Sequence, residues 1–161
     1  MGWMTWNLFK GDISDQLIRE TADAMVENGF VEAGYKYIFI DDLWQGGRDR
    51  HNNIIPDPKK FPHGIKALAD YVHSKGLKLG IYSDAAQLTC GGWTASLGFE
   101  EQDARTFASW GIDYLKYDYC NAPEDSATAR RRYKRMADAL QHSGRDIVLG
   151  ICEWGQRQCE E

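Results

Sequence analysis

The sequence predicts an α/β fold of the (β/α)8 TIM-barrel class, of which this chain covers about the first five βα units. One unit recurs along the chain, consisting of a helical pattern, a glycine, an apolar strand and a polar loop, and such alternation is typical of a parallel sheet. The glycines Gly76, Gly111 and Gly144 recur at intervals of 35 and 33 residues, the size of a βα unit. The long polar loops, over 44–62 and 85–97, both follow strands, which favours a barrel with its site on that side.

Five strands are predicted, whereas a closed barrel needs eight strands and roughly 250 residues. We therefore expect an incomplete barrel. A doubly wound sheet of five strands would fit the length, but no glycine-rich phosphate loop follows the first strand. The glycine pairs at 46–47 and 91–92 lack the G-x-G-x-x-G spacing of such a loop.

The first half of the chain predicts two strands and a helix before a long loop. A short strand is expected over 2–6. A helix over 14–28 follows, because apolar residues recur at helical spacing and Gly29 suits the position after its last turn. Its apolar stripe comprises Leu17, Ile18, Ala22, Met25 and Val26. The second strand, over 35–40, ends at the paired acids Asp41 and Asp42.

The second half alternates helices and strands regularly. A helix begins near Gly64, and its stripe comprises Ile65, Leu68, Ala69 and Val72. Strands are expected over 77–84, 114–120 and 147–152, with helices over 100–110 and 125–143 between them. The last helix has as its inward residues Ala129, Tyr133, Met136, Ala137 and Leu140.

The composition is that of an ordinary globular protein, with 43% hydrophobic and 27% charged residues. A net charge of −5 argues against nucleic-acid partners and against binding to an anionic membrane surface. No apolar run approaches the roughly 20 residues that a membrane span needs. Residues 1–7 lack the basic start and the long apolar core of a signal peptide, and they resemble the first strand of a domain.

The strand over 114–120 carries Lys116 and Asp118 on one face, because residues two apart on a strand point to the same side. Burying an ion without a partner costs several kcal/mol, so the two side chains either form ion pairs or line a cleft. We favour the cleft, because α/β folds have their sites at the carboxyl ends of parallel strands. A structural ion pair between the two residues is the alternative.

Acids end every predicted strand except the first, and these acids converge in a parallel barrel. They are Asp41, Asp42, Asp84, Asp118 and Glu153, whereas the first strand ends at Trp6. Two chemistries compete for such a cluster: binding of Mg²⁺ or Ca²⁺, and sugar hydrolysis by carboxylates. Lys116 disfavours a metal through its charge and favours an ionised Asp118, as a nucleophile requires. Asp84 is expected to be structural. The four histidines, His51, His63, His73 and His142, show no metal-ligand spacing.

The four cysteines, Cys90, Cys120, Cys152 and Cys159, form no C-x-x-C pair, so zinc or thioredoxin chemistry is not expected. Cys90 and Cys120 each follow the end of a predicted strand, and neighbouring strands lie about 4.8 Å apart, so a disulfide between them is geometrically reasonable. Two free buried thiols in a reducing cytosol are an equally compatible interpretation. A disulfide would favour a secreted, periplasmic or lysosome-like location, and free thiols would favour the cytoplasm.

Six segments, in this order, make the chain resemble the α-galactosidases (melibiases) of glycoside hydrolase family 27: residues 1–6 (MGWMTW), 37–44 (YIFIDDLW), 57–65 (DPKKFPHGI), 73–84 (HSKGLKLGIYSD), 116–120 (KYDYC) and 152–154 (CEW). The segments extend over nearly the whole chain, so the resemblance is specific. It implies that residues 1–161 are the N-terminal portion of a (β/α)8 glycosidase catalytic domain. It also implies retaining hydrolysis of terminal α-linked D-galactose in oligosaccharides or glycoconjugates, without a cofactor.

The same resemblance assigns roles to individual residues. Asp118 matches the nucleophile that forms the glycosyl-enzyme, and Cys90 and Cys120 match the disulfide beside it. The implied substrate-binding positions are Trp6, Asp41, Asp42, Tyr82, Lys116 and Glu153. In that pattern the paired aspartates hold hydroxyls on the far side of galactose, and Glu153 contacts the 2-hydroxyl. The related α-N-acetylgalactosaminidases have a small residue at the position of Glu153, so this chain favours plain galactose.

Two features depart from the family pattern. The general acid/base of the family is an aspartate well beyond the fifth strand, near an arginine, and neither lies within this chain. Glu160 and Glu161 lie too close to the fifth strand to replace it, and Cys159 has no counterpart. We therefore expect an α-galactosidase truncated before its acid/base. The alternatives are an α-N-acetylgalactosaminidase or related family 27 glycosidase, an inactive sugar-binding fragment, and a Mg²⁺-dependent barrel that uses Asp118 and Glu153 as ligands. An oligomer is compatible with any of them.

Overall fold

The computed structural model describes residues 1–157, and its centre is a parallel sheet of five strands. The strands run in the order β1-β2-β5-β6-β7. Their bounds are Gly2–Met4 (β1), Tyr37–Phe39 (β2), Lys78–Asp84 (β5), Tyr114–Asp118 (β6) and Val148–Cys152 (β7). Every neighbouring pair is parallel, so the predicted sheet is confirmed. The strand order follows the chain order, as in a barrel in which each new strand is added to the same edge.

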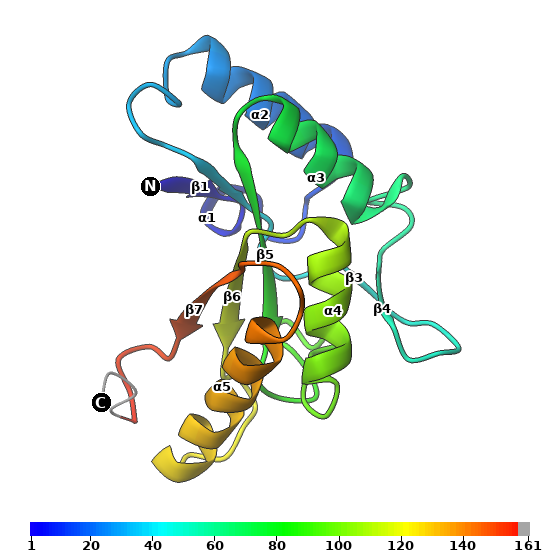
Figure 1. Ribbon diagram of the computed structural model, residues 1–161, viewed down its shortest axis with the longest axis vertical. Coiled ribbons are helices and arrows are strands. Elements are labelled where there is room, and N and C mark those ends of the chain that lie inside the picture. Colours follow the sequence, from blue (N-terminus) through cyan, green and yellow to red (C-terminus); the bar gives the residue numbers. More distant parts are fainter. Residues whose placement is uncertain (158–161) are drawn as a thin grey trace.

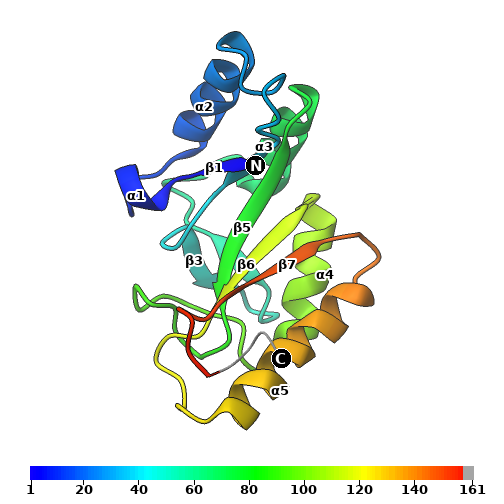
Figure 2. The ribbon, with the colours of Figure 1, turned by 90° about the vertical axis from the view of Figure 1, so that its left-hand side faces the viewer.

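Four long helices cover one face of this sheet. They are α2 (Asp15–Glu27), α3 (Gly64–Ser74), α4 (Glu100–Trp110) and α5 (Ser126–Gln141). Their apolar stripes pack against Ile38, Leu79, Ile81 and Leu115 of the strands, all of which are fully buried. Figure 1 shows the helices beside the strands, and Figure 2 looks onto the opposite face, where β5, β6 and β7 lie in front of α4. The uncovered face corresponds to the interior of the predicted barrel.

Aromatic residues and glycines alternate on the uncovered face. Phe39 stands in register with Gly80, which in turn stands in register with Tyr114. A Cβ atom on Gly80 would lie 2.3 Å from Cδ1 of Phe39, so only glycine fits there. The Phe39 ring meets the Tyr114 ring edge-on, with centroids 4.9 Å apart. Large residues therefore lie over small ones, as in the layered interior of a parallel barrel.

The helix boundaries agree with the predicted ones to within two residues. Ser14 caps α2 by accepting the N–H of Leu17 at 3.1 Å, and Asp125 caps α5 by accepting the N–H of Thr128 at 2.8 Å. Gly111 ends α4 with a φ of 82°, a conformation that favours glycine. Local capping chemistry explains why the sequence alone specified these ends.

The first strand predicted over 2–6 is longer than the observed strand. Strand β1 ends at Met4, and Trp6 begins the short helix α1 (Trp6–Phe9) instead of ending the strand. The carbonyl of Thr5 accepts the N–H of Phe9 at 2.9 Å, which closes one helical turn. The hydroxyl of Thr5 accepts the N–H of Asp41 at 3.0 Å and joins this turn to the end of β2.

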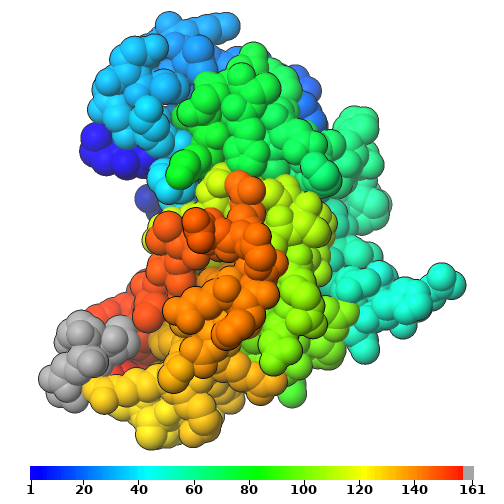
Figure 3. All heavy atoms as spheres, in the orientation of Figure 1, coloured from blue at the N-terminus to red at the C-terminus, as the bar shows by residue number. Residues whose placement is uncertain are grey.

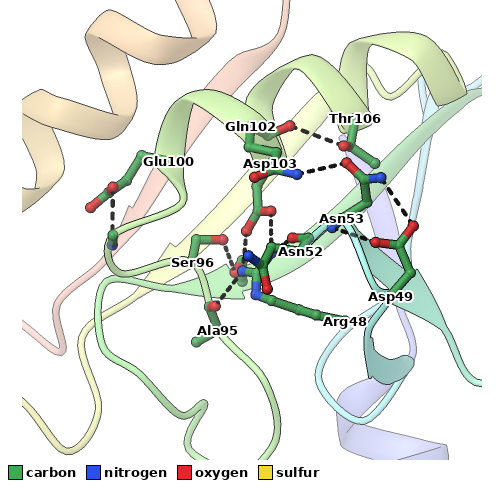
Figure 4. Close-up of polar contacts among 12 residues, drawn as sticks. Arg48, Asp49, Asn52, Asn53, Ala95, Ser96, Glu100, Gln102, Asp103 and Thr106 are labelled. Atoms are coloured by element: carbon green, nitrogen blue, oxygen red, sulfur yellow. Dashed lines mark hydrogen bonds and ion pairs between the residues drawn. The ribbon is translucent and has the colours of Figure 1, made fainter.

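The polar loop predicted over 44–62 contains an antiparallel hairpin, β3 (Gln45–Arg48) and β4 (Ile54–Pro56), whose tip projects from the side of the molecule (Figure 3, cyan). Arg48 attaches it to α4 by a two-pronged ion pair with Asp103, in which both N–O distances are 2.7 Å (Figure 4). Arg48 also donates to the carbonyl of Ala95 at 2.8 Å. The attachment of the hairpin to α4 depends on residues distant in the sequence, so the loop itself carries no local signal of it.

The helices of the described chain give no candidate for a membrane span. Within residues 1–157 no helix is both long enough and apolar enough to cross a bilayer.

Candidate active site

Strand ends and the loops after them enclose a cavity of about 280 Å³ on the carboxyl side of the sheet. It is lined by Trp6, Asp41, Asp42, Tyr82, Cys90, Lys116, Asp118, Cys152 and Trp154. A larger hollow of about 500 Å³ lies beside α5 and the start of β7, on the side of the sheet away from the acids. We take the smaller cavity as the site, because the convergent polar side chains lie there.

Asp118 ends β6 and is buried, with its carboxylate among three hydrogen-bond donors. Its Oδ2 accepts the hydroxyl of Tyr82 at 3.2 Å. Its Oδ1 accepts the backbone N–H of Tyr119 at 2.9 Å and the indole N–H of Trp154 at 3.1 Å. Both oxygens are therefore fixed in direction while the side chain still borders the cavity.

Lys116 and Asp118 line the same cavity, as their spacing on one strand predicted. The predicted alternative, an ion pair between them, is wrong as the main contact, because Nζ of Lys116 lies 2.8 Å from Oδ2 of Asp41. Burial alone would lower the pKa of Lys116, but the hydrogen bond and charge of Asp41 outweigh it and the pKa is raised. Asp118 adds a smaller electrostatic contribution in the same direction.

Asp41 and Asp42 hold a tight turn as well as facing the cavity. Oδ1 of Asp41 accepts the N–H of Asp42 at 2.8 Å, and Oδ1 of Asp42 accepts the N–H of Leu43 at 2.7 Å. Leu43 has a φ of 74°, which is rare for a residue with a branched side chain. Oδ2 of Asp42 accepts the N–H of Gly91 at 2.7 Å. The turn-forming role and the cavity-facing role thus coexist in the same two side chains.

Tyr82 and Trp6 supply the aromatic walls. The hydroxyl of Tyr82 bridges the space between Asp118 and Cys90, whose Sγ lies 3.2 Å away. Burial, followed by the charge of Asp118, raises the pKa of Tyr82 well above its ordinary value. The phenol therefore stays a proton donor at every physiological pH. Lys116 lies 5.2 Å from the centre of the Tyr82 ring.

Glu153 is the one predicted binding residue that does not line the cavity. Its carboxylate is buried and forms an ion pair with Arg157, while Oε2 has no hydrogen-bond partner within residues 1–157. The cavity wall is built instead by its neighbours Cys152 and Trp154, which sequence reasoning did not assign to the site. Cys152 stands in register with Asp118, so the parallel pairing of β6 and β7 was the signal that could have identified it.

Cys90 and Cys120 form the predicted disulfide, which joins the loop after β5 to the turn after β6. Cys152 is a free thiol, and burial together with the charge of Asp118 raises its pKa to about 11, so it remains protonated. Cys159, Glu160 and Glu161 lie outside the described residues. Predictions on those three positions therefore stay predictions.

One group of potential metal ligands occurs within residues 1–157, and it comprises Asp84, Cys90, Asp118 and Cys120. The two sulfurs are joined in the disulfide, which leaves two carboxylates. Glu153 is not in the group, so the arrangement gives no support to a Mg²⁺ site built from Asp118 and Glu153.

The chain is similar to known proteins in sequence and in fold. Residues 1–160 match a family model described as Alpha galactosidase A. An alpha-galactosidase of Coffea arabica is 57% identical over 158 residues, which are 97% of this chain and 41% of that protein. A crystal structure of a putative alpha-galactosidase/melibiase from Bacteroides fragilis has a TM-score of 0.96 at 57% identity and covers 98% of this chain. The structure of the Saccharomyces cerevisiae enzyme with raffinose has a TM-score of 0.94 at 42% identity.

The relatives are much longer than this chain. It spans 41% of the Coffea arabica protein, 34% of the Bacteroides fragilis chain and 35% of the Saccharomyces cerevisiae chain. The five strands and their helices therefore correspond to part of each relative's fold.

Proposed function

The chain belongs to the Alpha galactosidase A family, and from this premise we propose that residues 1–161 are the N-terminal portion of a (β/α)8 catalytic domain that hydrolyses terminal α-linked galactose with retention. The observation that supports this most directly is the environment of Asp118. Its carboxylate borders a cavity with aromatic walls, and its oxygens are aligned by the donors of Tyr82, Tyr119 and Trp154. Such alignment suits a nucleophile that must attack one carbon from one direction.

In the proposed reaction, Asp118 attacks the anomeric carbon and forms a glycosyl-enzyme, which water then cleaves. Asp41 and Asp42 accept hydrogen bonds from galactose hydroxyls, and Lys116 donates to them. Trp6 and Tyr82 cover the apolar faces of the ring. The Lys116–Asp41 pair keeps both charges fixed at 2.8 Å before substrate enters, which reduces the reorganisation that binding requires. The reaction needs no cofactor.

A retaining glycosidase also needs a second carboxyl group about 5–5.5 Å from the first, to protonate the leaving group. The other acids that border the cavity are engaged, because Asp41 pairs with Lys116 and Asp42 accepts two backbone N–H groups. Within residues 1–157 we therefore assign no acid/base. The family pattern assigns it to an aspartate beyond the fifth strand.

The proposed substrates are α-galactosides such as raffinose, the sugar named with the Saccharomyces cerevisiae structure. Glu153 remains our candidate for contact with the 2-hydroxyl, although in this structure it pairs with Arg157. Without its ion pair to Arg157, Glu153 would favour galactose over N-acetylgalactosamine. The alternative specificity is that of an α-N-acetylgalactosaminidase. The alternative in a different class is a sugar-binding fragment without turnover.

Because no acid/base is assigned within residues 1–157, the nucleophile can be tested directly with a substrate that does not need one. A fluorinated galactoside with an activated leaving group can transfer its sugar without acid assistance. An example is galactosyl fluoride that carries a second fluorine in place of the 2-hydroxyl. We expect the 161-residue chain to gain the mass of one fluorogalactosyl group, and peptide mapping to locate it on Asp118. Asp118→Asn should take up no label, whereas Asp113→Asn, at the other end of β6, should keep it.

The outcomes separate the alternatives. A label on any other residue contradicts the assigned nucleophile. Binding of galactose without labelling, measured by titration calorimetry, favours the sugar-binding fragment. Turnover of an unactivated aryl α-galactoside by this chain would show that residues 1–161 already hold an acid/base, against our assignment.

A further inference from the structure

Asp84 is an acid next to the proposed nucleophile that the proposed reaction does not use. It ends β5, stands in register with Asp118, and is fully buried. It does not line the cavity in this structure. Carboxylate oxygens of Asp84 and Asp118 lie within 4.8 Å of each other, and within the same distance of both disulfide sulfurs. Two like charges at this separation in a buried site interact strongly.

The two carboxylate oxygens of Asp84 differ in their hydrogen bonding. Oδ2 accepts the N–H of Cys120 at 2.9 Å, which fixes the turn that begins directly after Asp118. Oδ1 is buried without any hydrogen-bond partner within residues 1–157. A buried carboxylate oxygen without a donor is costly, and a proton on the carboxyl group removes most of that cost.

No cation neutralises Asp84 within the described part of the chain. Lys116 on β6 is engaged by Asp41, and Arg132 on α5 donates to the carbonyl of Ala85 at 2.7 Å. The remaining titratable neighbours are acids or phenols, namely Asp118 and Tyr117 on β6, Asp42 after β2, and Tyr82 on β5. Burial first, and then the charges of Asp118 and Asp42, raise the pKa of Asp84 to about 7, against the opposing backbone hydrogen bonds from Cys120 and Ala86.

We propose that Asp84 is a positioning residue for Asp118: it holds the Asp118–Cys120 turn through the N–H of Cys120, and the proton that it carries keeps a second negative charge away from the nucleophile. The proposal rests on the proposed function of Asp118. It predicts two states of the site. Below a pH of about 7 the proton on Asp84 removes its charge, and above that pH the ionised Asp84 repels Asp118 and strains the Asp118–Cys120 turn that it holds.

The test is an NMR titration of the 161-residue chain, with its disulfide intact, labelled with ¹³C at aspartate side chains and with ¹⁵N. We expect one carboxyl carbon to titrate with a midpoint near 7 and the amide of Cys120 to follow the same curve. Asp84→Asn should abolish both responses. Asp118→Asn should shift the midpoint to lower pH, because it removes the neighbouring charge. Asp113→Asn, the matched control at the far end of β6, should leave the midpoint unchanged.

The proposal is overturned if no aspartate titrates near neutral pH, if the midpoint is the same in Asp118→Asn, or if the Cys120 amide does not follow it. Should Asp84→Asn fail to fold, the comparison of wild type with Asp118→Asn still decides the electrostatic coupling. If Asp84 titrates as expected but no fluorogalactosyl label is found on Asp118, only the nucleophile assignment is rejected. Failure of this proposal and failure of the proposed function are therefore distinguishable.

Discussion

At the scale of single residues, the site depends on which charges find partners. Lys116 and Asp41 come from different strands, and their 2.8 Å contact satisfies two buried charges at once. Asp84 has only backbone partners, and burial raises its pKa to about 7. Two aspartates that look alike in the sequence therefore have different surroundings, because only one of them has a lysine within reach.

The Lys116–Asp41 pair gives a stability prediction. Lys116→Met preserves length but leaves the charge of Asp41 buried without its partner. We expect the free energy of unfolding at pH 7 to fall by roughly 2–3 kcal/mol, below the 3–5 kcal/mol typical of a fully buried pair, because the Lys116 side chain is 21% exposed. Urea denaturation measures it.

The matched control is Lys134→Met, since the Lys134–Asp138 pair is largely exposed, with 74% of the lysine side chain accessible. In Lys134→Met the free energy of unfolding should fall by less than about 1 kcal/mol. Adding Asp41→Asn to Lys116→Met should recover part of the stability, because the unpaired charge is then removed. Equal effects of the two lysine variants would contradict this view of the pair.

At the scale of elements, Asp113 connects helices and strands at the end of the sheet opposite the cavity. It accepts hydrogen bonds from His73 of α3 at 2.8 Å, from the N–H of Leu79 on β5 at 2.9 Å, and from Arg145 before β7 at 2.6 Å. Burial alone would raise the pKa of Asp113, but these donors outweigh it and the pKa is lowered. In a barrel this end of the strands serves stability.

The lowered pKa of Asp113 predicts that its contribution to stability depends on pH. An acid whose folded-state pKa lies below its unfolded value stabilises the fold above the unfolded value, near 3.8, and loses this contribution as the pH falls through the folded value. Asp113→Asn should therefore cost about 1–3 kcal/mol at pH 7 and progressively less below pH 4. Urea midpoints between pH 2 and pH 7 measure the difference. If the difference in urea midpoint between the wild type and Asp113→Asn is constant over that pH range, the predicted linkage is wrong.

At the scale of the whole molecule, residues 1–157 form an arc of a barrel with two edge strands, β1 and β7. A closed barrel has no edges, whereas here Val148 and Ile151 of β7 remain about half exposed. An open arc has fewer long-range contacts to resist unfolding, so a covalent link between its loops gains importance. The Cys90–Cys120 disulfide is that link, across 30 residues of chain.

Breaking this disulfide should act mainly on the unfolded chain, because the conformational entropy of the unfolded chain rises when the loop is no longer closed. For a loop of 30 residues the entropic contribution is about 3–4 kcal/mol. Cys90→Ser combined with Cys120→Ser should lower the urea midpoint accordingly, and Cys152→Ser, which keeps the disulfide, serves as the control. If the double variant and the control unfold at the same urea concentration, the link does not constrain the unfolded state.

What the sequence by itself determined is the local order of the chain. Helical spacing, capping residues and helix-ending glycines specified α2 to α5 within two residues, and parallel topology then brought the strand-end acids together. The helix boundaries depend on neighbours a few residues apart, and the alternation of helices with strands indicates the parallel sheet, so a single sequence contains both.

Only the tertiary structure decided which side chains meet. Lys116 pairs with Asp41 across 75 residues, and Arg48 pairs with Asp103 across 55, which attaches the hairpin to α4. Glu153 pairs with Arg157 and leaves the cavity wall to Cys152 and Trp154. The same applies to Asp84, whose proton reflects burial and the charges around it. Partner choice and burial are properties of the packed molecule, because they depend on distances between elements that no local pattern encodes.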